Sequence, residues 1–245
     1  MAKALVPLKD LVQAKSRLAG LLTPSERRAL AQAMVEDVLS VVAGHPRISG
    51  VTLVSDDPAA GLLASQYGIA HWPESALGCR GLNAVLAGAS ARLLADSDEP
   101  LVVLHGDLPL LASAEISAVL DRQLELGGVV VGCDRDGTGT NLLAFDGAGV
   151  PAFCFGQDSC RKHLMAAREA GLNTAVLRLP GVALDVDRPR DLAVLLASAE
   201  LPRTGEPVAS HTLALLRGRA LAARMKLALA SLRPAAAQTT QESTG

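Results

Sequence analysis

Short apolar runs rich in Val, Leu and Ala alternate along the chain with longer segments of helical periodicity. The apolar runs predict strands over residues 4–7, 51–55, 69–72, 100–107, 128–133, 141–145 and 174–179. The longer segments predict helices over residues 23–44, 57–66, 82–95, 113–126, 158–171 and 188–196. Thr23, Pro24 and Glu26 have the spacing of a capping box, which marks the start of the first helix.

This alternation of strands and helices indicates βαβ crossovers and a mostly parallel central sheet with helices on both faces. We therefore expect one Rossmann-like α/β domain over residues 1–199. Residues 200–233 are interpreted as a linker and a basic C-terminal helix, and residues 234–245 as a disordered tail. Leu and Ala dominate one face of the basic helix, which favours packing on the domain or formation of a homodimer over contact with another surface.

The composition argues against several classes of partner. The chain has 245 residues, is 49% hydrophobic and carries a formal net charge of −2, so no basic field attracts nucleic acid or an anionic membrane. Apolar runs stay well short of the roughly 20 residues that span a bilayer, and the N-terminus has no signal-peptide core. We expect a soluble, cytoplasmic protein. Its four cysteines form no CxxC pair and are interpreted as reduced thiols.

Ligands of open α/β sheets bind outside the carboxyl ends of the strands. After the first predicted strand, the segment PLKDLVQAKSRL carries Lys9, Lys15 and Arg17. Three cations at this position suit a polyphosphate, and the alternative is a solvated basic loop. At the end of the strand predicted over residues 100–107, the Asp107 carboxylate either binds a divalent cation or caps the next turn.

The segment GVALDVDRPRDL (residues 181–192) places Asp185 and Asp187 one residue apart in a strand-like run. In a strand both side chains lie on one face with their Cα atoms about 6.5–7 Å apart. Such a pair could chelate metal ions bridged by phosphate oxygens. Alternatively, the pair is the polar end of a strand, with Asp187 as the N-cap of the following helix. Asp191 is interpreted as an ordinary first-turn acid of that helix.

Two further loops are candidates for anion binding. The segment DRDGTGTNLLAF (residues 134–145) is either a loop whose amides approach an anion or a hairpin turn. In FGQDSCRKH (residues 155–163), Gly156 gives conformational freedom, and Asp158 or Ser159 is expected to cap the next helix, whose N-terminus attracts anions. We interpret His163 as a buried structural residue rather than a catalytic one.

Six segments occur together in the order of a known family: VPLKDLVQAKSRLAGLLTPSERRALAQAMVEDVL, GLNAVL, HGDLPLL, GTNLLAF, FGQDSCRKHLMAA and LDVDRPRDL. They resemble the phosphoenolpyruvate/2-phospho-L-lactate guanylyltransferases of deazaflavin coenzyme F-420 biosynthesis, over residues 4–197. The resemblance implies a fold like that of the nucleotide-diphospho-sugar transferases. It also implies GTP as co-substrate and a phospho-carboxylic acid as acceptor: phosphoenolpyruvate, 2-phospho-L-lactate or 3-phospho-D-glycerate.

The resemblance further implies roles for particular residues. Two Mg²⁺ ions would be held by Asp107, Asp185 and Asp187, with Lys15, Arg17 and Asp107 acting in catalysis. The nucleotide would contact Pro7, Lys9, Lys15, Arg17, Gly81, Leu82 and Asn83. The acceptor would lie against Thr140, Asn141, Gly156 and Ser159. The sequence departs from the family pattern at His105, Gln157, Asp158 and Cys160, and these departures bear on the acceptor more than on the reaction.

The expected reaction is direct nucleotidyl transfer, in which an acceptor phosphate oxygen attacks the α-phosphorus of GTP. The chain has no GxGxxG after the first strand, no GxxxxGK[ST] and no GxSxG, which argues against a dehydrogenase, a P-loop NTPase and an α/β-hydrolase. The alternatives are a molybdopterin guanylyltransferase, a sugar-phosphate cytidylyltransferase, a metal-dependent glycosyltransferase and a catalytically dead nucleotide-binding module.

Overall fold

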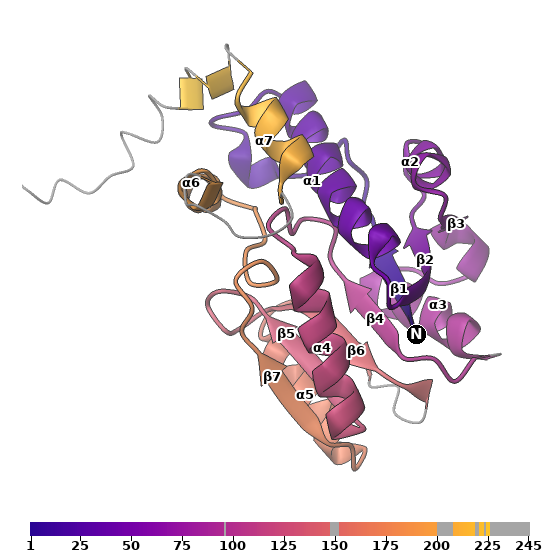
Figure 1. Cartoon of the computed structure of the whole chain (residues 1–245). Helices are drawn as coiled ribbons and strands as arrows, with labels where there is room; N and C mark the ends of the chain where they lie inside the picture. The colour runs from indigo at the N-terminus through magenta and orange to yellow at the C-terminus, as the bar shows by residue number, and fades with distance from the viewer. Residues whose placement is uncertain (96, 148–151, 200–207, 219–220, 223, 226–245) are drawn as a thin grey trace, which may run out of the picture.

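A computed structural model of the chain describes residues 1–95, 97–147, 152–199, 208–218, 221–222 and 224–225 (Figure 1). The strands are β1 (Ala2–Pro7), β2 (Ile48–Val54), β3 (Ala70–Trp72), β4 (Leu101–Leu104), β5 (Val129–Cys133), β6 (Thr140–Phe145) and β7 (Thr174–Leu177). The helices are α1 (Pro24–Gly44), α2 (Ala60–Tyr67), α3 (Leu82–Leu94), α4 (Ser113–Leu126), α5 (Ser159–Glu169), α6 (Pro189–Ala199) and α7 (Ser210–Leu216). Short 3₁₀ helices, η1 and η2, lie at Ser16–Leu18 and Glu74–Leu77.

The seven strands form one mixed sheet in the order β3-β2-β1-β4-β6-β5-β7. All neighbours are parallel except β6, which is antiparallel to both β4 and β5. The six-residue loop from Asp134 to Gly139 is too short for a crossover, so β5 and β6 form a hairpin. The mostly parallel sheet is confirmed, and of the two interpretations of residues 134–145 the hairpin is the one observed.

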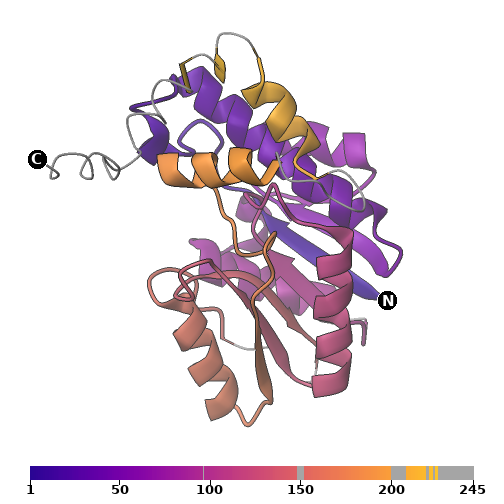
Figure 2. The same cartoon turned by 60° about the vertical axis from the view of Figure 1, so that its left-hand side comes forward.

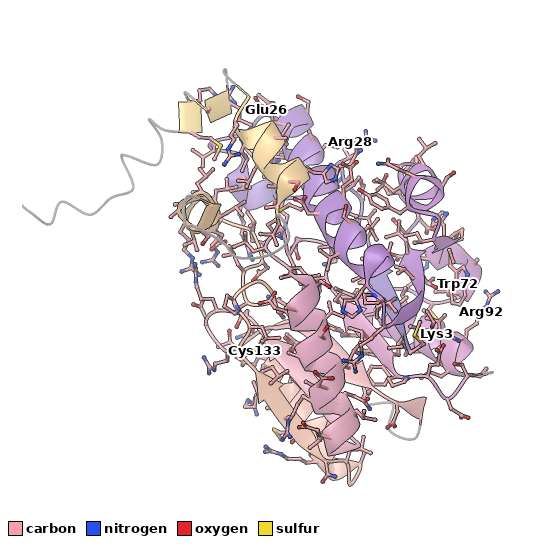
Figure 3. All side chains as sticks on the ribbon, viewed as in Figure 1. Lys3, Glu26, Arg28, Trp72, Arg92 and Cys133 are labelled. Carbon is pink, nitrogen blue, oxygen red and sulfur yellow. The ribbon has the colours of Figure 1, made fainter. Side chains whose placement is uncertain are left out.

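Helices cover both faces of the sheet (Figure 1, Figure 2). One core lies between the sheet and α1, α2 and α4, and includes Val6, Val35 and Ile116. The other lies between the sheet and α3 and α5, and includes Leu5, Leu86 and Phe145. Adjacent residues Leu5 and Val6 enter opposite cores because strand side chains alternate between faces. On edge strand β3, Trp72 lies under the Arg92 guanidinium of α3, with Cζ 4.4 Å from the ring centre (Figure 3).

Helix α1 begins as the sequence predicts. The Thr23 hydroxyl accepts a hydrogen bond from the Glu26 backbone N–H, and the Glu26 carboxylate accepts one from the Thr23 N–H at 2.8 Å. These bonds satisfy two backbone donors that lack partners inside the helix. Pro24 occupies the first helical position, where it displaces no hydrogen bond.

A third apolar cluster joins α1 to the C-terminal part of the chain. Leu213 and Leu216 of α7, together with Leu221 and Met225, pack against side chains of α1 and of two loops described below. We call α7, Leu221 and Met225 together the C-terminal brace. Figure 1 and Figure 2 both show α7 beside α1. At one end of the brace, Arg224 forms a 2.7 Å ion pair with Glu26, which Figure 3 labels.

Within residues 200–233 the sequence predicts a linker and one basic helix, whereas α7 ends at Leu216 and residues 221–222 and 224–225 are again helical. Residues 226–233 of the predicted helix lie outside the described residues. A turn and a bend at Arg217 and Gly218 follow α7, consistent with the low helix propensity of glycine. Residues 200–207 of the predicted linker and the predicted tail, 234–245, lie outside the described residues. In the described part of the chain, no helix is both long and apolar enough to cross a membrane.

Candidate functional site

A cavity of about 620 Å³ lies at the edge of the sheet where β1 and β4 end. These strands are parallel neighbours. From β1 the chain continues toward β2 and one edge of the sheet, and from β4 it continues toward β5 and the other edge. Such a switch point is where open α/β sheets bind ligands. Of the predicted site residues, the cavity is lined by Pro7, Lys9, Lys15, Arg17, Leu82, Asp107, Asn141, Asp185 and Asp187.

Lys15 lies at the centre of the charged groups in this cavity. Its ammonium is 2.6 Å from Oδ2 of Asp107 and 2.8 Å from Oδ1 of Asp187, and 7% of its side chain is exposed. Arg17 is more exposed, at 61%, and its guanidinium lies 3.3 Å from Asp187. The basic loop thus reaches the aspartates directly, so the interpretation as a merely solvated loop does not hold for Lys15.

The loop that carries Lys15 is fixed at both ends. At its start, the Leu11 N–H donates to the buried Asp57 carboxylate at 2.8 Å, which ties the loop to the end of β2. Lys15 itself has a left-handed backbone, with φ 55° and ψ 38°, a conformation that costs energy in a residue with a Cβ. The turn directs the chain into η1, where Leu18 enters the third cluster.

Charge interactions shift the pKa values of these groups in opposite directions. Burial disfavours the Lys15 ammonium, but Asp107 and Asp187 outweigh it and raise its pKa. Burial likewise opposes ionisation of Asp107, but Lys15 and His105 outweigh it and lower its pKa. Asp185 has no such cation, so burial and the nearby Asp107 charge raise its pKa. The cavity therefore holds a charged Lys–Asp arrangement beside a carboxyl that resists ionisation.

The segment that carries Asp185 and Asp187 is extended but is not a strand of the sheet, contrary to the sequence prediction. It lies beyond the end of β4, where the Val186 N–H donates to the Asp107 carbonyl at 3.2 Å. The side chains still alternate: Leu184 and Val186 are buried, and both aspartates are partly exposed to the cavity. The Asn141 side chain donates to Asp185 at 3.2 Å and so fixes its orientation.

Asp187 does not open α6. Helix α6 begins at Pro189, and Oδ2 of Asp191 accepts from the N–H groups of Asp187 at 3.2 Å and Arg188 at 2.8 Å. Asp191 is the first-turn acid that the sequence predicts, and it also holds the backbone of Asp187 in place. The Asp187 carboxylate is thereby left to face the cavity.

The donor chemistry of the cavity suits a hard divalent cation, because Asp107, Asp185 and Asp187 all line it and present carboxylate oxygens beside the basic loop. Within the described ranges, however, no three His, Cys, Asp or Glu side chains are grouped closely enough to hold a metal ion. The Lys15 ammonium occupies the space between two of the three carboxylates. The two predicted Mg²⁺ ions remain a prediction.

Several other predicted site residues are not among the residues that line the cavity. Thr140 and Ser159 are buried, and the Ser159 hydroxyl accepts from the Thr140 N–H at 2.8 Å. Gly81 precedes α3 with φ 84°, and Gly156 has φ 124°, a conformation that favours glycine. Asn83 binds the Phe155 backbone twice, accepting from its N–H at 2.8 Å and donating to its carbonyl at 3.2 Å. Their contacts with substrates remain predictions.

The predicted caps of α5 are absent: Asp158 holds the N-cap position with φ 55° and makes no side-chain capping bond, and Ser159 bonds to Thr140 instead. His163 is structural, as predicted. Its buried ring contacts the Thr140 hydroxyl at 3.0 Å and accepts from the Cys154 N–H at 2.8 Å. Burial, assisted by repulsion from His105, lowers its pKa to about 4, so its ring is neutral near pH 7.

Comparison with known proteins shows the family to which the chain belongs. A family model described as "Guanylyl transferase CofC like" matches residues 2–208. The chain belongs to this family. A phosphoenolpyruvate guanylyltransferase of Conexibacter woesei is 36% identical over 214 residues, covering 87% of this chain and 94% of that protein. A 3-phospho-D-glycerate guanylyltransferase of Phenylobacterium zucineum is 36% identical over 197 residues, covering 78% and 88%.

Solved structures support the fold of this guanylyltransferase. A putative nucleotide-diphospho-sugar transferase from Desulfovibrio desulfuricans aligns with a TM-score of 0.72 at 18% identity, covering 93% of this chain and 98% of that one. A 4-diphosphocytidyl-2C-methyl-D-erythritol synthase aligns with a TM-score of 0.55 at 11% identity, covering 80% and 98%. The expected likeness to nucleotide-diphospho-sugar transferases is confirmed.

Sequence reasoning missed two contributions to the site. Asp57 fixes the basic loop, and Asp191 holds the Asp187 backbone. Asp57 follows a predicted strand, so the rule that ligands bind at carboxyl ends of strands could have drawn attention to it. His105, which the sequence analysis noted only as a departure from the family pattern, lines the cavity. Nothing local indicates the bond from Asp191 to the Asp187 backbone.

Proposed function

We propose that the protein transfers GMP from GTP to a small phosphorylated carboxylic acid and releases pyrophosphate, in the biosynthesis of coenzyme F-420. The observation that carries the proposal is the convergence of Lys15, Asp107 and Asp187 from three separate segments in one cavity at the carboxyl ends of β1 and β4. A site that brings two polyanions together needs cations for their charge, and carboxylates to hold metal ions between them.

In the proposed reaction, a phosphate oxygen of the acceptor attacks the α-phosphorus of GTP in line. The bond from the α-phosphorus to the oxygen that bridges it to the β-phosphorus breaks, and the electron pair leaves with pyrophosphate. The nucleophile is already anionic near pH 7, so the reaction requires neither an activated Ser or Cys nor a general base. Catalysis then depends on positioning and on charge neutralisation.

The chain's own cations supply part of that neutralisation. Lys9, Lys15 and Arg17 lie on the loop after β1, and all three line the cavity. We assign the GTP triphosphate to this side, where Lys15 and Arg17 stabilise the departing pyrophosphate. Lys15 contacts two carboxylates in the structure described here, so it exchanges these partners for phosphate oxygens when GTP binds.

We propose that Asp107, Asp185 and Asp187 hold Mg²⁺. When bound, the metal supplies Lewis-acid charge at the phosphates. The raised pKa of Asp185, caused by burial and by Asp107, fits a group whose charge needs a cation beside it. Pro7 and Leu82 line the cavity, and with Gly81 and Asn83 they are assigned to the nucleotide.

For the acceptor, we infer a phospho-carboxylic acid bound near Asn141, Gly156 and the Thr140–Ser159 pair. The names of the relatives support phosphoenolpyruvate and 3-phospho-D-glycerate, and 2-phospho-L-lactate shares the same phosphate and carboxylate. These acids differ by a few atoms, so a small number of contacts decides among them.

The proposal is tested with purified protein, GTP and MgCl₂ and each of the three acids in turn, by following pyrophosphate and the guanylylated product. We expect product with at least one acid, and little with CTP in place of GTP. GTP binding without pyrophosphate release from any acid would contradict the proposal and indicate a nucleotide-binding module. Turnover with CTP but not GTP would indicate a cytidylyltransferase.

A further inference from the structure

His105 lines the cavity and stands two residues before Asp107 in the sequence. It follows β4 directly, and its backbone N–H donates to the Asn141 carbonyl at 3.0 Å. Its ring meets Phe155 edge to face, with 5.0 Å between ring centres. The backbone of Phe155 is in turn held by its two hydrogen bonds with the Asn83 side chain, one donated and one accepted by Asn83. The imidazole of this cavity-lining residue therefore packs against a ring whose backbone is itself held in place.

Neither ring nitrogen of His105 has a hydrogen-bond partner among the described residues, although the ring lines the cavity. A neutral imidazole offers one N–H donor and one nitrogen acceptor. A group that can both donate and accept matches this pair of functions, and a hydroxyl is the simplest such group.

Other uncharged polar side chains of the cavity are less suited to this role. Both hydrogens of the Asn141 amide are directed at protein groups, the Val182 carbonyl at 2.9 Å and Asp185 at 3.2 Å. Gln13 and Ser16 are exposed and belong to the basic loop, on the side assigned to the triphosphate. His105 is thus the cavity's neutral hydrogen-bonding group next to Asp107 whose capacity is not already used.

The position of His105 relative to Asp107 connects it with the acceptor. The attacking phosphate must approach the α-phosphorus near the carboxylates, so the carbon skeleton of a small acceptor lies within a few ångströms of Asp107. Of the three candidate acids, phosphoenolpyruvate and 2-phospho-L-lactate have no free hydroxyl. In 3-phospho-D-glycerate, the hydroxyl on C2 is free.

We propose that His105 recognises a free hydroxyl of the acceptor, and that the preferred substrates are therefore phosphorylated hydroxy acids such as 3-phospho-D-glycerate. This inference rests on the proposed guanylyl transfer and specifies its acceptor. A hydrogen-bonding group that is fixed in a cavity discriminates strongly, because an acceptor without the hydroxyl leaves it unpaired. The proposal concerns acceptors that carry both a phosphate and a carboxylate, and it does not extend to phosphate esters without a carboxylate.

The decisive comparison uses 3-phospho-D-glycerate and 3-phosphooxypropanoate, which is the same acid without the C2 hydroxyl. With wild-type protein, GTP and MgCl₂, kcat/KM for the hydroxy acid should exceed that for the deoxy acid by roughly tenfold to a hundredfold. The informative variant is His105→Phe, which keeps an aromatic ring against Phe155 but has no ring nitrogen. Its ratio of the two kcat/KM values should fall to near one, whereas His105→Gln, with one donor and one acceptor, should retain part of the preference.

Each outcome separates this inference from the proposed function. Turnover of both acids by the wild type at similar kcat/KM overturns the role of His105 and leaves guanylyl transfer intact. An undiminished ratio in His105→Phe overturns it too. If His105→Phe is inactive with both acids, the ratio in His105→Gln decides: a ratio equal to that of the wild type overturns the role of His105, and a ratio below that of the wild type supports it. Absence of product from every acid in the wild type contradicts the proposed function itself.

Discussion

Replacement of Lys15 with Met tests the charge arrangement of the cavity without relying on turnover. At an effective dielectric constant of about 20, each of the contacts at 2.6 and 2.8 Å corresponds to a gross attraction of about 6 kcal/mol. Desolvation of Lys15, whose side chain is 7% exposed, offsets most of this attraction. Removal of one partner from a buried pair costs about 3–5 kcal/mol. The side chains of Asp107 and Asp187 are 28% and 38% exposed. Solvent screening therefore reduces the expected loss of unfolding free energy in Lys15→Met to about 2 kcal/mol.

The free energy of unfolding in urea measures this loss, for wild type and Lys15→Met in EDTA and then in MgCl₂. Arg17→Met is the matched control, because Arg17 is on the same loop but is 61% exposed, and it should change stability by about 0.5 kcal/mol or less. We expect Mg²⁺ to reduce the deficit of Lys15→Met, since a bound cation neutralises the same carboxylates. Equal stability of Lys15→Met and wild type in EDTA would refute the reasoning.

The pH dependence of this deficit has a defined sign. Burial lowers the pKa of Lys15, but Asp107 and Asp187 outweigh burial and raise it above its ordinary value. The stabilisation is therefore complete below about pH 10.4 and is lost only as pH rises through the folded-state pKa. The difference between Lys15→Met and wild type should be the same at pH 6 and pH 9. A deficit that disappears by pH 9 would contradict the assignment.

Three further predictions concern catalysis and stability. Asp107→Asn should lower kcat by roughly 10²–10³-fold, whereas Asp121→Asn, a surface control whose side chain is 62% exposed, should leave steady-state turnover near wild type. Asp37 accepts hydrogen bonds from the His211 and Thr212 N–H groups at 2.8 and 3.0 Å, so Asp37→Ala should reduce the free energy of unfolding in urea by about 1–3 kcal/mol; no change would mean that α7 is not anchored there. Gly181→Ala should cost about 1–3 kcal/mol in the same assay, because a Cβ at Gly181 would overlap neighbouring backbone and side-chain oxygens, and a wild-type value would contradict that close packing.

Local sequence patterns predict most helices and strands of this protein because the interactions that define them are local. The predicted helix over residues 113–126 has the same bounds as α4, and the capping box at Thr23 forms as its spacing indicates. The antiparallel direction of β6 could also have been predicted, since its loop is too short for a crossover. The alternation of polar and apolar residues near Asp185 correctly indicates an extended chain.

Long-range interactions account for what the sequence did not predict. The segment with Asp185 and Asp187 is extended but joins no strand, because it lies past the end of β4 and bonds to the Asp107 carbonyl. Lys15 was expected to face a triphosphate, and its position between two aspartates depends on loops that are 92 and 172 residues away in sequence. The free ring nitrogens of His105 are likewise a property of the folded cavity and leave no local pattern.

The C-terminal brace has a consequence for how the protein matures during synthesis. Leu30 and Met34 of α1 pack in the same cluster as Leu213 and Leu216 of α7, which are translated about 180 residues later. At 5–20 residues per second, the ribosome needs roughly ten to forty seconds to cover that interval. During this time, the apolar face of α1 and the base of the Lys15 loop wait for their last partner. The nascent chain therefore completes the apolar packing beneath the Lys15 loop only after α7 has been synthesised.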